Sequence, residues 1–459
     1  MVDDGFLAEL RSILTDQHVL VDDDAEPYAR DWTGRWHQRP GVVVRPGTSE
    51  QVASIVKLCR RSGTAIVARG GNTGLVGGSV ADARQVLIDL TRLDGIGPVI
   101  DGTVTVEAGV TVGSLQRHAA AAGWRYPVDF GARDSATIGG SIATNAGGMH
   151  VFRHGMTRAQ VLGVEVIDGH GRLIDARRRV IKDNTGPSIA ALMCGSEGTL
   201  GVVTSATLRL IPAQPDRSVA LLAFASLDDA LRAVPVLCDV ATVEAIELID
   251  GPCWAVMAHE FGAALAADPA AVIAVETTSD AATATDALGP VDWSIDSAVG
   301  EGAAAERLWR YRDEIADVLA RRGTVTKFDV SVPSAAMADL IERTGRLAAA
   351  DSDDTSLHAF GHAADGNLHL NLLGVVDDAA LGDAVHRLVL ELGGSVSAEH
   401  GVGRAKNRWL AVQHSSAELS ALASLRDAFD PGRILNPEVL RPTDLGVPAP
   451  LEARPADPS

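Results

Sequence analysis

Residues 69–78 read RGGNTGLVGG, and five of these ten residues are glycine. They follow directly on the short apolar run at 65–67, which predicts a strand. Glycine tolerates positive φ and lets a ligand approach the backbone closely, and successive exposed amides form a concavity that binds anions. The stretch lacks the Gly-Lys-Ser/Thr ending of a Walker A loop, and no helix is expected directly after it, as the Rossmann fingerprint requires. It therefore predicts a cofactor-phosphate loop of another type, with a flexible hairpin as the alternative.

The sequence before this loop predicts one strand–helix–strand unit over residues 42–68. A β-branched run at 42–44 predicts the first strand. Thr48 and Gln51 fit a capping box, with a hydroxyl at the helix cap and an amide three residues later. Apolar residues at helical spacing follow, and Gly63 predicts the end of the helix.

Two more stretches have a similar composition, GARDSATIGGSIATNAGG at 131–148 and GSEGTLGVVT at 195–204. Small residues, amides and hydroxyls dominate the first of them, so we expect a loop there rather than a packed helix or strand. Three such loops suit an extended dinucleotide held by backbone groups better than a single phosphate.

The rest of the chain predicts two mixed regions. The first continues to about residue 213, with a short helix near the N-terminus, strands at 86–90, 103–107 and 161–167, a hairpin turn at 168–171, a helix at 111–122 and another after Pro187. The second covers about 217–390, with helices near 227–240, 302–322 and 334–349 and strands near 219–224, 271–276, 325–332 and 356–361. The Pro-, Ala- and Asp-rich sequence after Leu440 predicts a disordered tail.

Composition excludes several classes of protein. A net charge of −20 over 459 residues, with 4% aromatics, disfavours binding to nucleic acid or to anionic membrane surfaces. The four cysteines, none of them spaced as Cys-x-x-Cys, disfavour a disulfide framework and an iron–sulfur cluster. No signal peptide is visible, and no uncharged apolar run approaches the roughly 20 residues that span a bilayer. We therefore expect a cytoplasmic protein.

Histidines gather late in the chain, in GHAADGNLHLN at 361–371 and SAEHGVG at 397–403. These two segments hold three of the thirteen histidines, His362, His369 and His400, and Glu399 directly precedes the last. Imidazole and carboxylate suit Zn²⁺, Mn²⁺ or Fe²⁺, and three protein ligands with an open position are typical of a catalytic metal. The alternative is a set of ordinary hydrogen-bonded core histidines.

An anionic substrate in so acidic a chain needs local cations. Arg312 and Lys327 are candidates, because arginine can bind a carboxylate with two parallel hydrogen bonds and lysine offers a point charge. The residues alone leave open that both are solvated surface cations.

These loops and histidine segments together resemble the FAD-linked D-2-hydroxyacid dehydrogenases: D-lactate dehydrogenase, D-2-hydroxyglutarate dehydrogenase and the glycolate oxidase D subunit. This branch belongs to the vanillyl-alcohol oxidase/p-cresol methylhydroxylase superfamily, and the resemblance runs from about residue 30 to 440. It implies an α+β fold with a two-subdomain FAD-binding domain and an α+β substrate (cap) domain with an antiparallel sheet. The implied divisions are a lead-in at 1–33, an FAD-binding domain at 34–214, a substrate domain with the metal site at 215–425, a return to the FAD-binding domain at 426–441 and a tail at 442–459.

The resemblance also implies roles for particular residues. His362, His369 and Glu399 would bind the metal, preferably zinc, and His400 would be the general base. Arg312, Lys327 and Asn371 would bind substrate. Asn72 stands where some members attach FAD to a histidine, which implies noncovalent FAD. The implied FAD-binding residues are Arg69, Gly70, Gly71, Asn72, Thr73, Gly74, Gly77, Gly78, Gly131, Ser135, Thr137, Ile138, Gly139, Gly140, Ala143, Thr144, Asn145, Gly147, Gly148, Glu197, Gly198, Gly201, Val202 and Asn436.

The implied reaction is oxidation of a small D-2-hydroxy acid to the 2-oxo acid, with hydride transfer to flavin N5. Dehydrogenases of D-2-hydroxyglutarate usually carry a hydroxyl residue four positions after the arginine, where this chain has Ala316, so lactate or another 2-hydroxy acid stays open. An electron-transfer flavoprotein, a quinone or a cytochrome could accept the electrons, and a homodimer is compatible with the sequence. Three alternatives remain: an FAD-dependent alcohol or sugar oxidase or lipid-forming synthase of the same superfamily, a metal hydrolase that binds a nucleotide, and a subunit of a larger oxidase such as glycolate oxidase.

Overall fold

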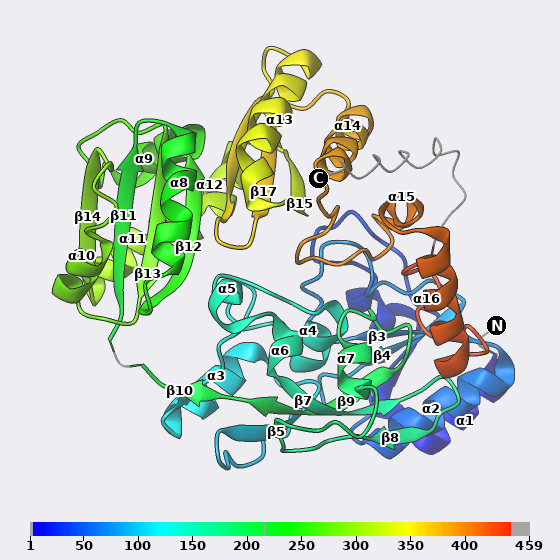
Figure 1. Ribbon diagram of the computed structural model, residues 1–459. Coiled ribbons are helices and arrows are strands. Elements are labelled where there is room, and N and C mark those ends of the chain that lie inside the picture. Colours follow the sequence, from blue (N-terminus) through cyan, green and yellow to red (C-terminus); the bar gives the residue numbers. More distant parts are fainter. Residues whose placement is uncertain (1–2, 215, 442–459) are drawn as a thin grey trace.

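The computed structural model describes residues 3–214 and 216–441, so the tail expected at 442–459 lies outside the described residues. Figure 1 shows two parts, which we call the N-terminal unit, built on residues 3–214, and the seven-stranded unit, which follows it. The last described residues run back to the N-terminal unit. Among the described residues, no helix is both long and apolar enough to cross a membrane.

The first sheet of the N-terminal unit has the strand order β1-β2-β4-β3. Its strands are β1 (Val19–Leu20), β2 (Val42–Val44), β3 (Ala65–Arg69) and β4 (Gln85–Asp89), and helices α1 (Asp4–Ile13) and α2 (Ser49–Ser62) share one apolar cluster with it. Both β2 and β3 run parallel to β4, which lies between them. The predicted strand–helix–strand unit is confirmed.

The start of α2 differs in one detail from the predicted capping box. The Thr48 side chain accepts the Gln51 backbone N–H as expected, but the Gln51 side chain accepts the N–H of Gly47 at 2.8 Å, one residue before the cap. The helix ends at Gly63, whose φ of 67° is favourable for glycine.

The second sheet of this unit is antiparallel, with the order β5-β9-β7-β8. Its strands are β5 (Thr103–Glu107), β7 (Val161–Ile167), β8 (Leu173–Asp175) and β9 (Val202–Arg209). Helices α3 (Val112–Ala121), α4 (Ile138–Thr144) and α7 (Ile189–Met193) pack into its apolar cluster, α5 (Val151–His154) and α6 (Thr157–Gln160) follow α4, and β6 (Trp124–Arg125) pairs with β10 (Ile211–Pro212). The strands expected at 103–107 and 161–167 and the turn at 168–171 are confirmed.

The expectation of a loop throughout 131–148 is wrong, because its centre forms α4. Thr137 caps this helix by accepting the Gly140 N–H, and Asn145 ends it with φ of 53°. A β-carbon on Gly139 would lie 2.7 Å from the Ala108 side chain. The small residues therefore permit close packing of a helix, which their composition alone did not reveal.

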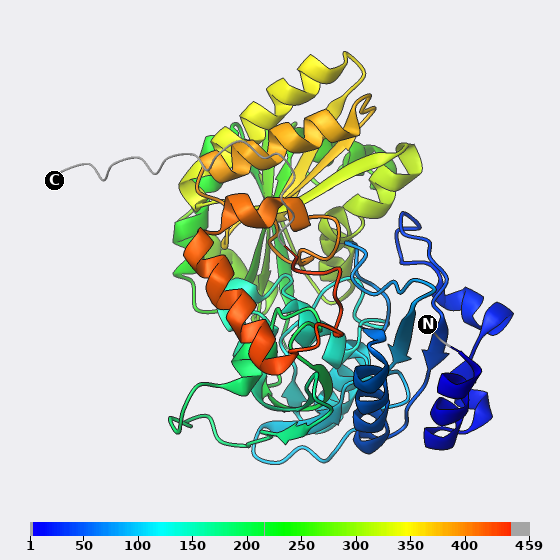
Figure 2. The same cartoon turned by 90° about the vertical axis from the view of Figure 1, so that its right-hand side faces the viewer.

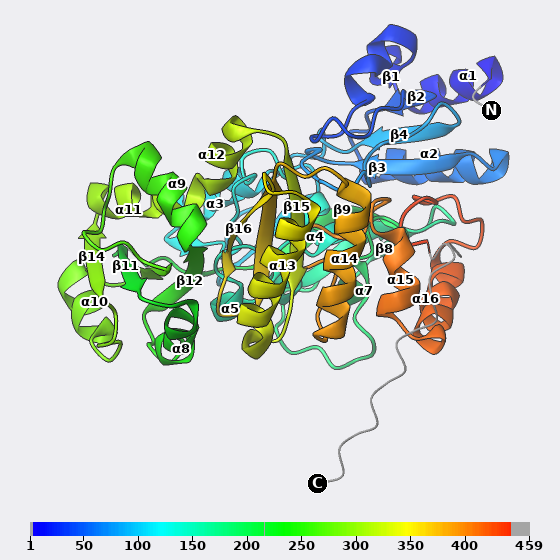
Figure 3. The same cartoon turned by 90° about the horizontal axis from the view of Figure 1, so that it is seen from above.

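The seven-stranded unit is one antiparallel sheet with the order β14-β11-β13-β12-β16-β17-β15. The strands are β11 (Ser218–Phe224), β12 (Val243–Asp250), β13 (Ala271–Thr277), β14 (Asp296–Glu301), β15 (Val325–Ser331), β16 (Ser356–His362) and β17 (Asn367–Leu373). One face is covered by α8 (Leu227–Cys238), α10 (Ala281–Leu288), α13 (Met337–Asp351) and α14 (Asp378–Glu391), and the other by α9 (Gly251–Phe261), α11 (Ala303–Asp313) and α12 (Ile315–Arg322). Figure 3 shows the sheet between these two layers of helices.

Two expectations for this unit need correction. The helix expected at 302–322 is interrupted at Glu314, so α11 and α12 are separate helices. No strand was expected at 243–250, 296–301 or 367–373, where β12, β14 and β17 lie; of these, β12 is fully buried in the sheet. Its acidic side chains, Glu244, Glu247 and Asp250, interrupt the apolar pattern by which a buried strand is recognised.

The C-terminal part of the described chain contacts the N-terminal unit. Figure 2 shows helix α16 (Ser416–Phe429), in orange-red, leading down along that unit after the short helix α15 (Leu410–Gln413). Further on, the Ile66 N–H of β3 donates to the Ile434 carbonyl oxygen at 2.7 Å, and the Asn436 N–H donates to the Ile66 carbonyl oxygen at 2.8 Å. The segment thus lies beside the edge strand β3.

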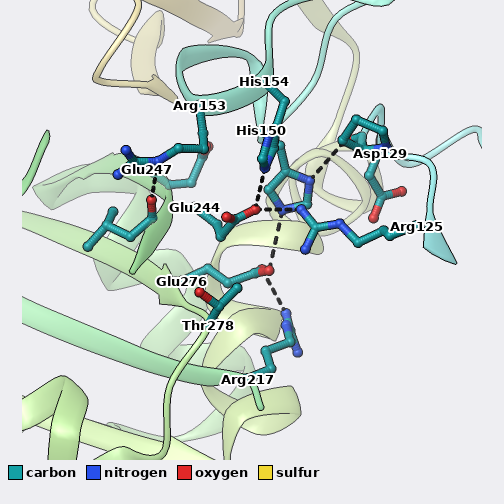
Figure 4. Close-up of polar contacts among 12 residues, drawn as sticks. Arg125, Asp129, His150, Arg153, His154, Arg217, Glu244, Glu247, Glu276 and Thr278 are labelled. Atoms are coloured by element: carbon teal, nitrogen blue, oxygen red, sulfur yellow. Dashed lines mark hydrogen bonds and ion pairs between the residues drawn. The ribbon is translucent and has the colours of Figure 1, made fainter. Parts of the chain in front are cut away.

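Buried charges join the two units, as Figure 4 shows. His150 Nε2 lies 3.3 Å from Glu276 Oε1 on β13, and Arg217 donates to the other oxygen of Glu276 at 3.1 Å. His154 Nε2 lies 2.7 Å from Glu244 Oε2 on β12. These contacts hold the segment that follows α4 against the seven-stranded sheet.

Candidate active site

A cavity of about 500 Å³ is lined by both units. The N-terminal unit contributes the loop at 69–78 and parts of 130–147 and 197–203. The seven-stranded unit contributes side chains from β15, β16 and β17, and the 397–403 segment contributes Glu399 and His400. This volume is typical of cofactor and substrate sites.

Most of the residues expected to bind FAD line this cavity. They are Arg69, Gly70, Gly71, Asn72, Thr73, Gly74, Gly78, Gly131, Thr137, Gly139, Gly140, Ala143, Thr144, Gly147, Glu197, Gly198, Gly201, Val202 and Asn436. Five others are not among the lining residues: Gly77, Ser135, Ile138, Asn145 and Gly148. Ile138 lies in the core, and Asn145 ends α4. A β-carbon on Gly77 would strike Trp36, and one on Gly148 would strike the Asp129 carbonyl oxygen. These four residues therefore pack behind the residues that line the cavity.

The loop at 69–78 and the 131–148 segment touch each other, and we call them together the glycine cradle. A β-carbon on Gly70 would lie 2.1 Å from Thr137 Oγ1, and one on Gly71 would lie 1.7 Å from the Ser135 carbonyl oxygen. Glycine is therefore required at 71 by the close approach of two backbones, and at 70 by the Thr137 side chain, which caps α4. The nearby Asn72 side chain donates to the Arg30 carbonyl oxygen at 3.0 Å and accepts from Ser79 at 2.8 Å.

Sequence reasoning missed several apolar lining residues, among them Trp32, Phe130, Phe328 and Phe360. Trp32 is 74% exposed although it lines the cavity. Single aromatic residues are indistinguishable in sequence from ordinary core positions, so no signal pointed to them.

The expected metal ligands lie together. One potential ligand atom from each of His362, His369 and Glu399 falls within 4.8 Å of the other two, and His362 Nε2 is 3.5 Å from Glu399 Oε1. The two histidines come from the antiparallel neighbours β16 and β17, whose connecting turn contains Gly366 with φ of 77°. The set of two imidazoles and one carboxylate fits a catalytic divalent metal ion.

Two buried carboxylates that sequence reasoning missed stand behind this group. Glu247 Oε1 lies 2.7 Å from His362 Nδ1. Asp329 Oδ2 accepts the backbone N–H groups of Glu399 and His400 at 2.9 and 3.0 Å. Neither belongs to a recognisable motif, because each reaches the site only through the pairing of its strand.

The pKa values of these groups reflect a concentration of negative charge around two imidazoles. Burial alone would raise the pKa of Glu247, but Arg312 and His362 hold it at about 2. Burial and, to a smaller extent, the nearby His362 together lower the pKa of His369 to about 4, which keeps the His369 imidazole neutral. Against the effect of burial, Glu247 and Glu399 raise the pKa of His362 well above its ordinary value. The field at this point favours a cation.

A second group of acidic and imidazole side chains, Asp329, Glu399 and His400, also comes close enough to hold an ion. Asp329 is a poor ligand there, because Oδ2 already accepts two backbone N–H groups and Oδ1 accepts the Asn367 side chain at 2.9 Å. We therefore assign Asp329 to support rather than to coordination. Burial would raise its pKa, but His400, Lys406 and His369 keep it well below the ordinary range.

The expected substrate-binding residues separate into two groups. Lys327 and Asn371 face each other directly on β15 and β17, and both line the cavity together with His400. Arg312 is not among the lining residues. Its Nε donates to Glu247 at 2.6 Å, and its guanidinium lies 4.8 Å from the ring centre of Phe360, which does line the cavity. Direct contact between Arg312 and substrate stays a prediction.

Comparison with known proteins places this chain in a family. Residues 40–177 match the family described as FAD binding domain, and residues 213–440 match the C-terminal domain of FAD linked oxidases. The chain belongs to the FAD-linked oxidases and is an FAD-dependent oxidoreductase.

Similar proteins show to which branch of this family the chain belongs. A D-2-hydroxyglutarate dehydrogenase of Xanthomonas citri pv. viticola is 37% identical over 436 residues, which cover 90% of this chain and 92% of the relative. A D-2-hydroxyglutarate dehydrogenase of Stutzerimonas stutzeri is 31% identical, and the match covers 95% of this chain and 99% of the relative. A putative mitochondrial D-lactate dehydrogenase of Schizosaccharomyces pombe is 31% identical, and the match covers 90% of this chain and 84% of the relative. The chain thus belongs to the D-2-hydroxyacid dehydrogenase branch, as the resemblance implied.

Solved structures confirm the expected fold class. p-Cresol methylhydroxylase superposes with a TM-score of 0.74 at 17% identity, over 95% of this chain and 96% of that one. An alkyldihydroxyacetonephosphate synthase superposes with a TM-score of 0.73 at 16% identity, over 95% of this chain and 84% of that one. The fold is the α+β fold of the vanillyl-alcohol oxidase/p-cresol methylhydroxylase superfamily.

Proposed function

We propose that this protein oxidises a small D-2-hydroxy acid to the 2-oxo acid, with noncovalently bound FAD and one divalent metal ion. The observation that carries the proposal is the shared cavity. It brings the glycine cradle, which is suited to the cofactor, together with His369, Glu399, His400, Lys327 and Asn371. FAD supplies the hydride acceptor. Asn72 offers no nucleophile for covalent attachment, which supports noncovalent binding.

The metal is held by His362, His369 and Glu399, with zinc as the first choice and manganese or iron as alternatives. As a Lewis acid it lowers the pKa of a bound hydroxyl group. Lys327 and Asn371 bind the substrate carboxylate from adjacent strands, since a lysine gives a charge-assisted hydrogen bond and an amide gives a neutral one.

His400 is the general base in this proposal. Its Nδ1 lies 3.5 Å from Asp329 Oδ2, so the carboxylate favours a proton on Nδ1 and leaves Nε2 to take the substrate hydroxyl proton. Histidine is the side chain that most often performs such a proton transfer in enzymes.

The substrate belongs to the D-lactate or D-2-hydroxyglutarate class. Curated relatives carry both names, and Ala316, which lines the cavity, offers no hydrogen bond to a second carboxylate. Electron-transfer flavoprotein, a quinone or a cytochrome accepts the electrons, and the protein acts as a monomer or homodimer. Residues 34–214 and 426–441 form the FAD-binding domain and 215–425 the substrate domain; the pairing of Ile434 and Asn436 with β3 supports this division.

The test is anaerobic reduction of the bound flavin, followed by its visible absorption. D-lactate or D-2-hydroxyglutarate should bleach the flavin of the wild-type protein, and His400→Ala should slow bleaching by about 100-fold or more, the usual contribution of a general base. The exposed His259→Ala serves as the matched histidine control and should react at the wild-type rate. A wild-type flavin that neither acid reduces would contradict the substrate class, and a fast His400→Ala variant would remove His400 from the base role.

A further inference from the structure

Glu247 occupies a position from which it can act on the metal site without reaching it. It lies on β12 directly opposite His362 on β16, in the antiparallel pairing Glu247↔His362. Directly opposed side chains on one face of a sheet are close neighbours. The Glu247 side chain is fully buried, and it is not among the residues that line the cavity.

Each carboxylate oxygen of Glu247 has its own partner. Oε1 lies 2.7 Å from Nδ1 of His362, and Oε2 accepts from Nε of Arg312 at 2.6 Å. A hydrogen bond at Nδ1 requires the proton on that nitrogen, which leaves Nε2 as the metal-binding atom. Nε2 is the atom that faces Glu399, at 3.5 Å.

We propose that Glu247 is a positioning residue for the metal: it fixes the tautomer and orientation of His362, and Arg312 balances its buried charge. This inference rests on the proposed metal site. A carboxylate behind a ligating imidazole sets the ring's orientation and raises its basicity, and its loss typically lowers metal affinity 10- to 100-fold. Arg312 acts here through Glu247, because a buried carboxylate with no cation beside it would not stay ionised.

Another glutamate on the same strand shows that the arrangement is specific. Glu244 is also buried, but it pairs with His154 and Arg125 at the junction between the units. Glu244 lies at the register shift between Val243 and Ala245 in the pairing of β12 with β13, whereas Glu247 lies in the regular pairing with β16, opposite His362. Among the described residues of β12, only Glu247 contacts one of the expected metal ligands, His362.

The experiment measures the Zn²⁺ affinity of the FAD-loaded protein after metal removal, by competition with a chromophoric chelator. Glu247→Gln should bind Zn²⁺ about 10- to 100-fold more weakly than wild type. Because Glu247→Gln leaves the Arg312 charge unbalanced and could fail to fold, the double variant Glu247→Gln/Arg312→Gln provides a neutral pair of similar shape. It should fold and still show weakened binding.

Asp250→Asn is the matched control. Asp250 lies three residues further along β12, is also buried, and accepts the N–H groups of Cys253 and Ala359 without touching a ligand. This variant should lower the melting temperature while leaving the Zn²⁺ affinity unchanged. The visible spectrum of bound Co²⁺ should change in the Glu247 variants and stay constant in Asp250→Asn.

The outcomes separate the inference from the function on which it rests. A wild-type protein that binds no divalent metal would contradict the proposed metal site itself. A wild-type protein that binds Zn²⁺, with the double variant binding it equally well, would overturn the role of Glu247 and leave the metal site intact. Equal weakening in Asp250→Asn would also overturn it, because the effect would then follow from damage to the strand.

Discussion

Gly147 of the N-terminal unit lies so close to Glu399 that a β-carbon at position 147 would sit 3.0 Å from Glu399 Oε1. The same β-carbon would be 3.1 Å from the Val151 side chain. A proposed metal ligand is therefore set against the bare backbone of the N-terminal unit. Glycine at 147 is favoured by this close approach rather than by its backbone angles.

Gly147→Ala should accordingly displace Glu399 by a few tenths of an ångström and slow flavin reduction by about 10-fold, since small misplacements in an active site have large kinetic costs. The measurement is the rate of anaerobic flavin reduction at saturating 2-hydroxy acid. Gly345→Ala is the matched control, because Gly345 lies on α13, does not line the cavity, and its β-carbon would meet no described atom within 4 Å. Equal rates for the two variants would argue against a tight contact at Glu399.

Chelation should separate the metal from the flavin. The glycine cradle holds its cofactor without His362, His369 or Glu399, so dialysis against a strong chelator should remove about one metal ion per chain and abolish turnover while the flavin spectrum persists. Adding Zn²⁺ should restore activity. Elemental analysis and visible absorption of the same sample provide the check, and full activity in metal-free protein would contradict a catalytic metal.

The pair His150–Glu276 should make stability depend on pH. Burial raises the pKa of Glu276, but His150 and Arg217 bring it to about 2, below its ordinary 4.5, so its contribution is present above pH 4.5 and is lost as the pH falls toward 2. Burial lowers the pKa of His150, but Glu276 raises it above 6.5, so its contribution is complete below pH 6.5 and is lost at higher pH. The pair is therefore strongest between pH 4.5 and 6.5.

Glu276→Gln tests this through chemical unfolding over a range of pH. Removing one partner of a buried pair should cost about 3 kcal/mol of unfolding free energy inside that window and less on either side of it. Glu306→Gln removes the other, 72% exposed partner of Arg217 and should change stability little at any pH. A constant difference between Glu276→Gln and wild type at all pH values would show that titration of this pair is unimportant.

Position 316 should control preference for a second carboxylate. Ala316→Thr adds a hydroxyl donor to the cavity wall, whereas Ala316→Val adds the same volume without it. The ratio of kcat/KM for D-2-hydroxyglutarate to kcat/KM for D-lactate should be about 10-fold higher in Ala316→Thr than in Ala316→Val. This is the effect of one hydrogen bond to a charged group. Steady-state kinetics with an artificial dye acceptor measure the ratio, and equal ratios in both variants would place the second carboxylate elsewhere.

Lys327→Met should lower kcat/KM for either acid by about 10- to 100-fold, because a charge-assisted hydrogen bond to the substrate carboxylate is lost. Lys57→Met, on the exposed surface of α2, should leave it unchanged. Titration of the flavin spectrum with a 2-oxo acid product gives an independent measure of binding. An unaffected variant would exclude Lys327 from the carboxylate site.

Local signals in the sequence predicted much of this structure. The loop at 69–78, the strand–helix–strand unit before it and the histidine segments each depend on short-range chemistry that a single stretch displays. His362, His369 and Glu399 were singled out because two short segments concentrate histidine and carboxylate side chains, and the resemblance then implied that these three bind the metal. Their proximity in the structure agrees with that expectation.

What could not be predicted depends on contacts between distant segments. Helix α4 was missed because close packing on Ala108 selects the same small residues as a loop does. Strand β12 was missed because Glu244 and Glu247 are buried by partners from elsewhere in the chain, His154 and His362. The separation of Arg312 from the cavity likewise follows from its pairing with Glu247, which no spacing in the sequence reveals.

Asn436 donates its side-chain N–H to the carbonyl oxygens of Gly78 and Glu197, at 3.0 and 2.9 Å, and itself lines the cavity. During synthesis on the ribosome, residue 436 emerges long after the loops that it joins. The nascent chain can therefore form both sheets of the N-terminal unit while its flavin site still lacks one wall. Loading of FAD should accordingly be completed only after residue 436 has emerged and reached these loops.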